Sequence, residues 1–176
     1  MIVAFTGKRG SGKNTAAQAL IDLGYADLSF AAPLRAVTHA AYGVTYLEMS
    51  DPILKERVLN RYPFKSPRQL LTYIGTEMFR AYIDDTWVRA MERETLKYTH
   101  AVITDLRFLN EEDLMNRIGA SIIRVVNPTL KNTDTVSQHR SETEMDQIVP
   151  AYTLVNDGTI AQLHARVRAL VGEDIQ

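Results

Sequence analysis

The sequence predicts an α/β fold, a three-layer sandwich with a mostly parallel five-stranded sheet, flanking helices and a helical insertion. Two observations predict it. Short apolar runs recur along the chain, and most lack strict apolar/polar alternation, as is typical of strands buried on both faces of a parallel sheet. Between the runs, apolar residues recur at helical spacing, so strands and helices alternate. The 176 residues fit a single domain.

Five apolar runs are expected to form the strands. They are residues 2–5, 25–30, 101–103, 122–126 and 152–155. The run at 25–30 is the weakest of them. Parallel strands in one sheet are joined by right-handed crossovers, which the intervening helices would supply.

The helical patterns lie between these runs, and several carry terminal signals. They cover residues 15–23, 33–42, 67–82, 87–96, 110–118 and 160–171. Pro33 suits the first turn of its helix. Asn110 is a capping residue followed by two glutamates, which suit the positive end of a helix. Thr159 and Gln162 have the spacing of a capping box, which predicts the start of the last helix.

Two segments interrupt the alternation. The segment from about 43 to 98 is predicted to be mostly helical, and its length indicates a helical insertion that binds the substrate. The polar stretch 127–140 lacks a periodic apolar signal and is predicted to be a long loop. That loop is either a lid over bound phosphates or a plain solvated loop. The lid candidates are Lys131, His139 and Arg140.

Composition excludes several classes of site and partner. Cysteine is absent, which rules out disulfides, cysteine–zinc sites and thiol catalysis. Lysine and arginine number 20 against 21 acidic residues, so the net charge of −1 gives no support for a nucleic-acid partner. The four histidines include no close pair, which argues against a histidine-rich metal site. No apolar run approaches the roughly 20 residues of a membrane span.

Residues 7–15 have the glycine spacing of a phosphate-binding loop. Gly7 is followed five residues later by Gly12 and then Lys13, after an apolar run and before a helical pattern. Glycines let successive backbone N–H groups point at phosphate oxygens, and Lys13 would reach the β- and γ-phosphates. The alternative is a glycine-rich turn with a helix cap and no ligand. The predicted nucleotide-binding residues here are Gly7, Lys8, Gly10, Ser11, Gly12, Lys13, Asn14 and Thr15.

The loop departs from the usual pattern directly after its lysine. A serine or threonine normally holds Mg²⁺ at that position, whereas this chain has Asn14, with Thr15 one residue later. Thr15 could reach the metal or a phosphate, or Asn14 could hold a metal-bound water, and both arrangements stay open. Arg9 lies within the loop, close to where charge moves, and is the candidate charge-stabilising arginine. The alternative for Arg9 is an exposed loop residue.

A second group of candidates follows the apolar run 101–103. Asp105 and Arg107 come directly after it, and ligands of open α/β sheets bind at the carboxyl ends of strands. Asp105 could hold Mg²⁺ through water or accept the proton of an attacking group. Arg107 could clamp a phosphate through two parallel hydrogen bonds. The alternative is that the two residues form a surface pair or a turn cap.

Weaker candidates lie in and before the helical insertion. Arg35 follows the second apolar run, and Arg68 and Gln69 open a helical pattern. Arginines on helices are mostly solvated, so each alone is a weak signal. Phe64 and Trp87 could stack on a base, but a core position is favoured for both.

Taken together, these segments resemble the phage-type deoxynucleoside monophosphate kinases of the P-loop kinase superfamily. Besides the loop GKRGSGKNT at 7–15, the resemblance rests on FAAPLR at 30–35, SPRQLL at 66–71, IGTE at 74–77, TDLRF at 104–108 followed by Asn110 and Glu111, HRSE at 139–142 and NDGT at 156–159. The loop is shared by many families, whereas the later segments in this order are more specific. The chain differs from the family at Asn14, where the family usually has Asp.

The resemblance implies transfer of the γ-phosphoryl group of ATP to a deoxynucleoside 5′-monophosphate, with Mg²⁺ bound to the ATP. The catalytic candidates among the residues are Lys13, Arg9 and Asp105, and the metal-holding candidates are Thr15, Asn14 and Asp105. By resemblance, the base and sugar of the acceptor lie against the insertion around Arg68 to Trp87. The predicted acceptor-binding residues are Arg35, Arg68, Gln69, Gly75, Thr76, Trp87, Arg107 and Glu111. The adenine of ATP would lie near Asn156 and Gly158.

Two other functions stay open. One is a related P-loop kinase acting on a modified base in DNA or on a coenzyme precursor, although the near-zero net charge weighs against DNA. The other is a nucleotide-binding module without turnover. The expected partners are ATP and the monophosphate, with no membrane or nucleic acid, and a homodimer is left open. The expected location is the cytoplasm, that of the host cell if the protein is of phage origin.

Overall fold

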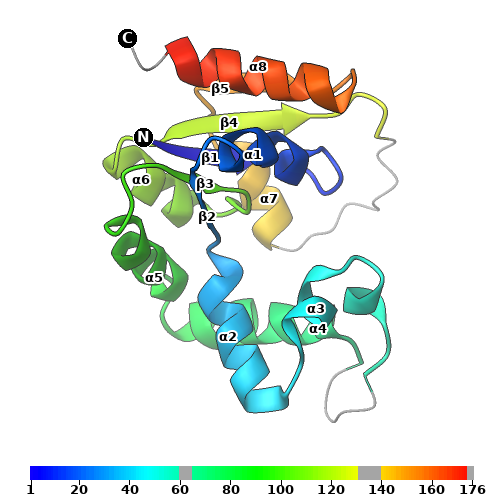
Figure 1. Cartoon of the computed structure of the whole chain (residues 1–176). Coiled ribbons are helices and arrows are strands. Elements are labelled where there is room, and N and C mark those ends of the chain that lie inside the picture. The colour runs from blue at the N-terminus through cyan, green and yellow to red at the C-terminus, as the bar shows by residue number, and fades with distance from the viewer. Residues whose placement is uncertain (60–64, 131–139, 174–176) are drawn as a thin grey trace. The chain divides into compact units, whose positions relative to one another are not determined.

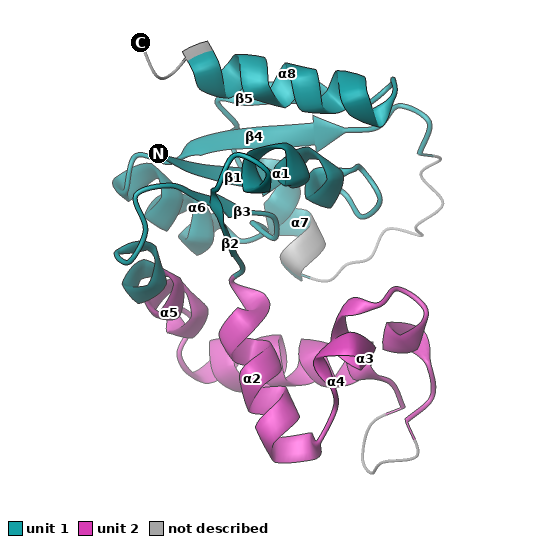
Figure 2. Cartoon of the chain, in the orientation of Figure 1, with its two compact units in different colours: residues 1–29, 92–176 teal, residues 30–91 magenta. Residues whose placement is uncertain are grey.

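The computed structural model describes residues 1–59, 65–130 and 140–173. These residues form two compact units: unit 1 comprises residues 1–29 and 92–176, and unit 2 comprises residues 30–91 (Figure 2). Unit 2 begins earlier than the predicted insertion at 43–98. The reason is that helix α2 (Ala31–Tyr42) packs against the later helices of the same unit.

Unit 1 is built on a five-stranded parallel sheet, which confirms the predicted fold class (Figure 1). The strands are β1 Ile2–Thr6, β2 Ala26–Leu28, β3 Ala101–Ile103, β4 Ser121–Val126 and β5 Tyr152–Val155. Their order across the sheet is β2-β3-β1-β4-β5, and every neighbouring pair is parallel. The carboxyl ends of β3, β1 and β4 therefore lie side by side at one edge.

Helices cover both faces of this sheet. Helices α1 (Lys13–Ile21) and α8 (Ile160–Glu173) pack on each other and enclose one apolar core with Ile123 and Val125 of β4. Successive strand residues point to opposite faces, so Arg124 points to the other face. There it donates hydrogen bonds to backbone carbonyls at the end of α7 (Arg140–Gln147). Helix α6 (Leu109–Arg117) contacts both α7 and β4.

The regular elements described in unit 2 are all helical. They are α2, α3 (Tyr46–Ser50), the 3-10 turn η1 (Leu54–Glu56), α4 (Pro67–Thr72), the π-helix η2 (Tyr73–Arg80) and the first part of α5 (Thr86–Thr95). Their core consists of Val44, Met49, Leu70, Leu71 and Ile74. None of the helices described in the chain is long and apolar enough to cross a membrane.

Two predicted helices differ from the structure, and one helix, α7, was not predicted. The helix predicted at 67–82 is α4 followed by the π-helix, a rare form that apolar spacing does not signal. Helix α6 begins at Leu109, before the expected cap Asn110, because the Glu111 carboxylate reaches back to accept the Phe108 N–H at 3.2 Å. Helix α7 begins at Arg140, the last residue of the predicted loop 127–140, and the sequence did not predict this helix. Its sequence holds a single apolar residue, Met145, so no periodicity marks it.

Candidate active site

The glycine-rich loop joins the end of β1 to the start of α1 at the carboxyl edge of the sheet. Gly7 and Gly12 have φ angles of +130° and +104°, which residues with side chains rarely adopt. A Cβ at Gly7 would lie 2.4 Å from the Val125 carbonyl oxygen, and one at Gly12 would lie 2.3 Å from Asn156 Nδ2. Both positions therefore require glycine, and the loop can run tightly between β4 and the turn after β5.

Two side chains of the loop indicate where it would bind an anion. Lys13 Nζ donates hydrogen bonds to the backbone carbonyls of Gly7 and Lys8, the latter at 2.9 Å, so the ammonium group lies over the loop. Ser11 is 1 % exposed, and within the described part of the chain its hydroxyl has no hydrogen-bond partner. Leaving a buried polar group unsatisfied costs about 1–3 kcal/mol. A ligand oxygen here would remove that cost.

The turn after β5 supports the loop. Asn156 Nδ2 donates a hydrogen bond to the Ser11 carbonyl oxygen at 2.9 Å. The next residue, Asp157, pairs with Arg166 of α8 at 2.7 Å, and this guanidinium lowers the pKa of the Asp157 carboxyl below its ordinary value. Asn156, predicted near the adenine, thus stabilises the glycine-rich loop by bonding to its backbone.

The predicted capping box at the start of α8 is confirmed. The Thr159 N–H donates to Gln162 Oε1 at 2.8 Å, and the Gln162 N–H donates to Thr159 Oγ1 at 3.3 Å. A Cβ at Gly158 would lie 2.3 Å from the same Gln162 oxygen. Gly158, the second residue predicted near the adenine, therefore leaves room for this cap.

Asp105 lies at the same edge of the sheet as the loop, because it follows β3, the neighbour of β1. Its Oδ2 accepts a hydrogen bond of 2.6 Å from Ser29 Oγ. Ser29 follows β2, the other neighbour of β3. This hydroxyl fixes the orientation of the carboxylate, and the sequence did not single it out because a serine after a short strand carries no distinctive pattern.

Arg107 is half-buried two residues further on, and its segment is held by Glu111. The Arg107 N–H donates to Glu111 Oε2 at 2.9 Å, and the Phe108 N–H donates to the same oxygen. Glu111 is 2 % exposed. The resemblance implies a substrate contact for Glu111, whereas in the structure its carboxylate fixes the backbone that carries Arg107.

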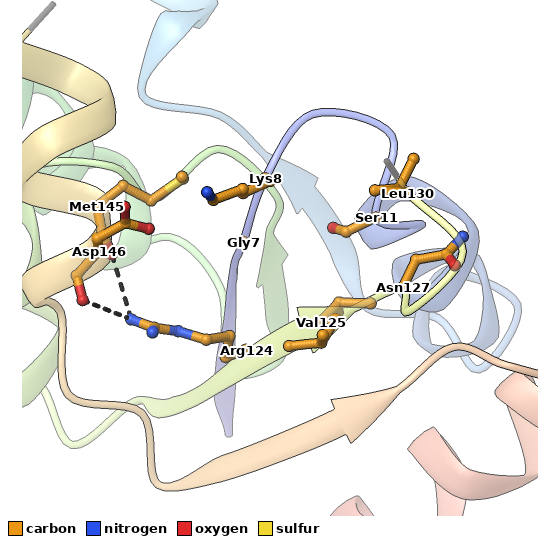
Figure 3. A pocket seen from close by; sticks show the side chains of 10 residues that line it. Gly7, Lys8, Ser11, Arg124, Val125, Asn127, Leu130, Met145 and Asp146 are labelled. Atoms are coloured by element: carbon orange, nitrogen blue, oxygen red, sulfur yellow. Dashed lines mark hydrogen bonds between the residues drawn. The ribbon is translucent and has the colours of Figure 1, made fainter. Parts of the chain in front are cut away.

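A cavity of about 240 Å³ adjoins the glycine-rich loop (Figure 3). Its lining residues are Gly7, Lys8, Ser11, Arg124, Val125, Val126, Asn127, Leu130, Met145 and Asp146. Lys8 points across it toward Met145 and Asp146 (Figure 3). Arg124 donates to the carbonyl oxygens of Met145 at 3.2 Å and Ile148 at 2.6 Å. The sequence did not reveal Arg124, since one arginine within an apolar run usually marks a solvated position.

The residues of unit 2 that are predicted to bind the acceptor monophosphate differ in their contacts. Arg35 of α2 has a buried Nε that finds no hydrogen-bond partner among the described residues. Arg68 forms an ion pair with Glu56. Gln69 Oε1 accepts the Lys65 N–H at 2.8 Å. Arg35 is therefore the residue of this group with an unsatisfied donor.

Two further candidates lie in the packed interior of unit 2. Trp87 is 5 % exposed, and its Nε1 donates to the Gly75 carbonyl oxygen at 3.0 Å. A Cβ at Gly75 would lie 2.9 Å from Leu34 Cδ2. The core position favoured for Trp87 is thus the one observed. Thr76 is half-buried on the same π-helix.

Two of the predicted lid residues, Lys131 and His139, lie outside the described residues, as does Phe64. The third, Arg140, is the first residue of α7. It forms an ion pair with Glu144, and its guanidinium carbon lies 5.6 Å from the centre of the Phe108 ring.

The candidate metal ligands are oxygen donors. The Thr15 hydroxyl, the Asn14 amide oxygen and the Asp105 carboxylate are of the types that Mg²⁺ prefers. Over the described ranges, no group of three or more His, Cys, Asp or Glu side chains could hold an ion unaided. Mg²⁺ usually binds one or two protein oxygens together with substrate phosphates, so these residues fit an ion that arrives with a nucleotide.

Comparison with known proteins relates the whole chain to one group of enzymes. The sequence model of a family described as deoxynucleotide monophosphate kinase matches residues 53–167. A putative deoxynucleotide monophosphate kinase of Acanthamoeba polyphaga mimivirus is 31 % identical, over 97 % of this chain and 96 % of that protein. The deoxynucleotide monophosphate kinase of Escherichia phage RB69 is 24 % identical, over 73 % of this chain and 54 % of the phage protein.

Solved structures share the fold at lower identity. TT1252 from Thermus thermophilus has a TM-score of 0.58 at 20 % identity, with 98 % of this chain and 97 % of that one aligned. Dephospho-CoA kinase from Campylobacter jejuni has a TM-score of 0.54 at 16 % identity, with 98 % and 96 % aligned. At these identities the likeness establishes the architecture alone.

Proposed function

The chain belongs to the deoxynucleotide monophosphate kinase family, and we propose that it transfers the γ-phosphoryl group of ATP to a deoxynucleoside 5′-monophosphate. An oxygen of the monophosphate attacks the γ-phosphorus, and the bond from that phosphorus to the bridging oxygen of ADP breaks. The products are ADP and the deoxynucleoside diphosphate. Catalysis of such a transfer depends on positioning and on neutralising charge, and the residues of the site supply both.

One observation carries this proposal. The glycine-rich loop and Asp105 follow neighbouring parallel strands, β1 and β3, and so lie at one edge of the sheet. The loop offers backbone N–H groups, an ammonium group and an unsatisfied Ser11 hydroxyl to an anion. Asp105 offers an oriented carboxylate beside them. A phosphate cradle next to a carboxylate is the arrangement that phosphoryl transfer requires.

The loop binds the phosphates of ATP in this proposal. Lys13 exchanges its contacts with the Gly7 and Lys8 carbonyls for the β- and γ-phosphate oxygens, which are stronger acceptors for an ammonium group. Arg9 neutralises the charge that develops on the transferred group.

Asp105 and Arg107 act on the monophosphate that accepts the phosphoryl group. Asp105, held by Ser29, aligns the attacking phosphate or accepts its proton. Arg107 binds a phosphate group with its guanidinium, while Glu111 holds its backbone. In unit 2, Arg35 binds the acceptor monophosphate, since its Nε is a buried donor without a partner in the described chain.

Mg²⁺ bound with ATP would neutralise phosphate charge, and Thr15, Asn14 and Asp105 are the residues that would hold it, directly or through water. Asn14 carries no charge, so it attracts the ion less strongly than an aspartate at the same position would. The hydroxyl of Thr15, in the first turn of α1, then becomes the more important ligand.

The substrates in this proposal are free nucleotides. The net charge of −1 does not favour binding to the nucleic-acid backbone. A cytoplasmic location, that of the host cell if the protein is of phage origin, would give access to the nucleotide pool.

The test is a coupled assay of ADP formation with ATP, Mg²⁺ and each of dAMP, dCMP, dGMP and dTMP in turn. The same assay is run with dephospho-coenzyme A and with duplex DNA carrying a modified base. We expect ADP only when one or two of the monophosphates are present. Release of ADP only with the coenzyme precursor or DNA, or with ATP alone, would overturn the proposal.

A further inference from the structure

Two carboxylates hold three consecutive backbone N–H groups in the segment that carries the catalytic candidates. Glu111, from the first turn of α6, accepts the N–H groups of Arg107 and Phe108 at 2.9 and 3.2 Å. Glu144, from α7, accepts the next N–H, that of Leu109, through Oε2 at 3.0 Å. The backbone directly after Asp105 and Arg107 is therefore fixed from two different helices.

Glu144 has a second partner on its other oxygen. Its Oε1 pairs with Arg140 Nε, one turn earlier on α7, while the Arg140 guanidinium lies over the ring of Phe108. Phe108 is 7 % exposed. The side chain of Glu144 is 15 % exposed, so solvent screens its charge little. The Leu109 N–H thus depends on Glu144 directly, and the Phe108 ring depends on it through Arg140.

The carboxyl end of helix α7 is anchored by contacts that do not involve Glu144, which makes the helix a support for that residue. Arg124 of β4 donates to the carbonyl oxygens of Met145 and Ile148. Glu112, 9 % exposed on α6, accepts the Val149 N–H at 2.7 Å. Removing Glu144 should therefore free the Leu109 N–H at the start of α6 without releasing α7.

We propose that Glu144 is a positioning residue for phosphoryl transfer: it holds the start of α6 so that Asp105 and Arg107 lie where the reaction needs them. The inference rests on the proposed function of that site. Glu144 contacts no phosphate in this account and acts through the backbone of Leu109 and through Arg140. A displacement of about 1 Å at a reacting group can cost about a hundredfold in rate, so such a support has a measurable effect.

The first measurement is amide hydrogen exchange, which requires no activity. In Glu144→Ala the amide of Leu109 should exchange faster, by about tenfold, because it loses a hydrogen bond to a charged group. The amides of Arg107 and Phe108 keep their bonds to Glu111 and should change less. Glu144→Gln keeps an oxygen that can accept the Leu109 N–H, so exchange should change less. The matched control is Glu92→Ala, which removes the 2.8 Å ion pair to Arg117 at the opposite end of α6. It should leave the amides of 107–109 unchanged.

The second measurement is steady-state kinetics on the same variants. Glu144→Ala should lower kcat by about tenfold while the KM for ATP stays within about twofold, because the ATP loop is not part of the support. In an Asp105→Asn background, Glu144→Ala should lower kcat by less than it does alone, because the support acts on kcat through Asp105.

Three outcomes would overturn the inference: unchanged exchange of the Leu109 amide in Glu144→Ala, an equal change in Glu92→Ala, or an unchanged kcat in an active Glu144→Ala enzyme. If Glu144→Ala does not fold, Glu144→Gln decides: faster exchange of the Leu109 amide together with a lower kcat supports the positioning role, and faster exchange with full kcat contradicts it. Absence of monophosphate-dependent turnover in the wild type would refute the proposed function instead, and the exchange result would still stand.

Discussion

The side-chain amide of Asn156 donates a hydrogen bond of 2.9 Å to the backbone carbonyl of Ser11, 145 positions earlier in the chain. The same Nδ2 occupies the space that a Cβ on Gly12 would need, 2.3 Å away. The turn after β5 and the phosphate-binding loop are thus fitted to each other in shape and in hydrogen bonding. This contact explains why an asparagine at the end of the last strand matters to a site at the end of the first.

Gly12→Ala should destabilise the protein for two separable reasons, a clash with Asn156 and a φ of +104°. Asn156→Ala removes the clash but leaves the backbone strain, about 1–2 kcal/mol for a side chain in this region. In urea titrations, Gly12→Ala should therefore cost less in the Asn156→Ala background than in the wild type, but still a measurable amount. Equal costs in both backgrounds would show that Asn156 does not restrict the loop.

Arg9→Ala should lower kcat at saturating ATP and monophosphate by much more than fivefold, because an arginine at the transferred group contributes about 10³–10⁵ in related chemistry. Stability should hardly change, since Arg9 lies in an exposed part of the loop. Arg93→Ala, an exposed arginine on α5, serves as the control. A loss below about fivefold, roughly 1 kcal/mol of barrier, would make Arg9 an ordinary loop residue.

Asp105 and Arg107 should affect different kinetic constants. Asp105→Asn can still accept the Ser29 hydrogen bond, so the fold should persist while kcat falls. Arg107→Ala should mainly raise the KM of a phosphate-bearing substrate, because it removes a donor to phosphate. Steady-state kinetics and thermal unfolding on both variants separate these effects. Changes in unfolding temperature alone would assign the pair a structural role.

The metal dependence should respond to Asn14 and Thr15. Asn14→Asp should lower the Mg²⁺ concentration needed for half-maximal activity, because a carboxylate attracts this hard ion more strongly than an amide. Thr15→Ala should raise it, and by more than Asn14→Ala does. The measurement is a Mg²⁺ titration of activity in the three variants. Identical curves would leave Asp105 as the protein ligand.

Much of unit 1 could be predicted from the sequence, for a physical reason. Buried parallel strands need continuous apolar runs, and the five runs became β1 to β5. The loop could be predicted because Gly7 and Gly12 stand where only glycine fits. Both signals are local in the sequence.

The rest could not be predicted, since it depends on contacts between distant segments. Ser29, which follows β2, donates a hydrogen bond to Asp105, which follows β3. Arg124 of β4 donates to the carbonyl oxygens of Met145 in α7 and of Ile148 directly after it. Apolar spacing does not distinguish the π-helix from an α-helix, and α7 holds a single apolar residue. Glu111 can accept the Arg107 and Phe108 N–H groups because helix α6 begins at Leu109, and the sequence placed that start one residue too late.

The central claim is that the glycine-rich loop binds ATP for phosphoryl transfer, and Lys13→Ala tests it most directly. Lys13 is the cation that lies over the loop, bonded to the Gly7 and Lys8 carbonyls. The measurement is kcat for monophosphate-dependent ADP formation, with thermal unfolding of the same samples. We predict a loss of several orders of magnitude in kcat with little change in unfolding temperature. A folded variant that keeps more than about a tenth of wild-type kcat, a barrier change under about 1.4 kcal/mol, would contradict the account.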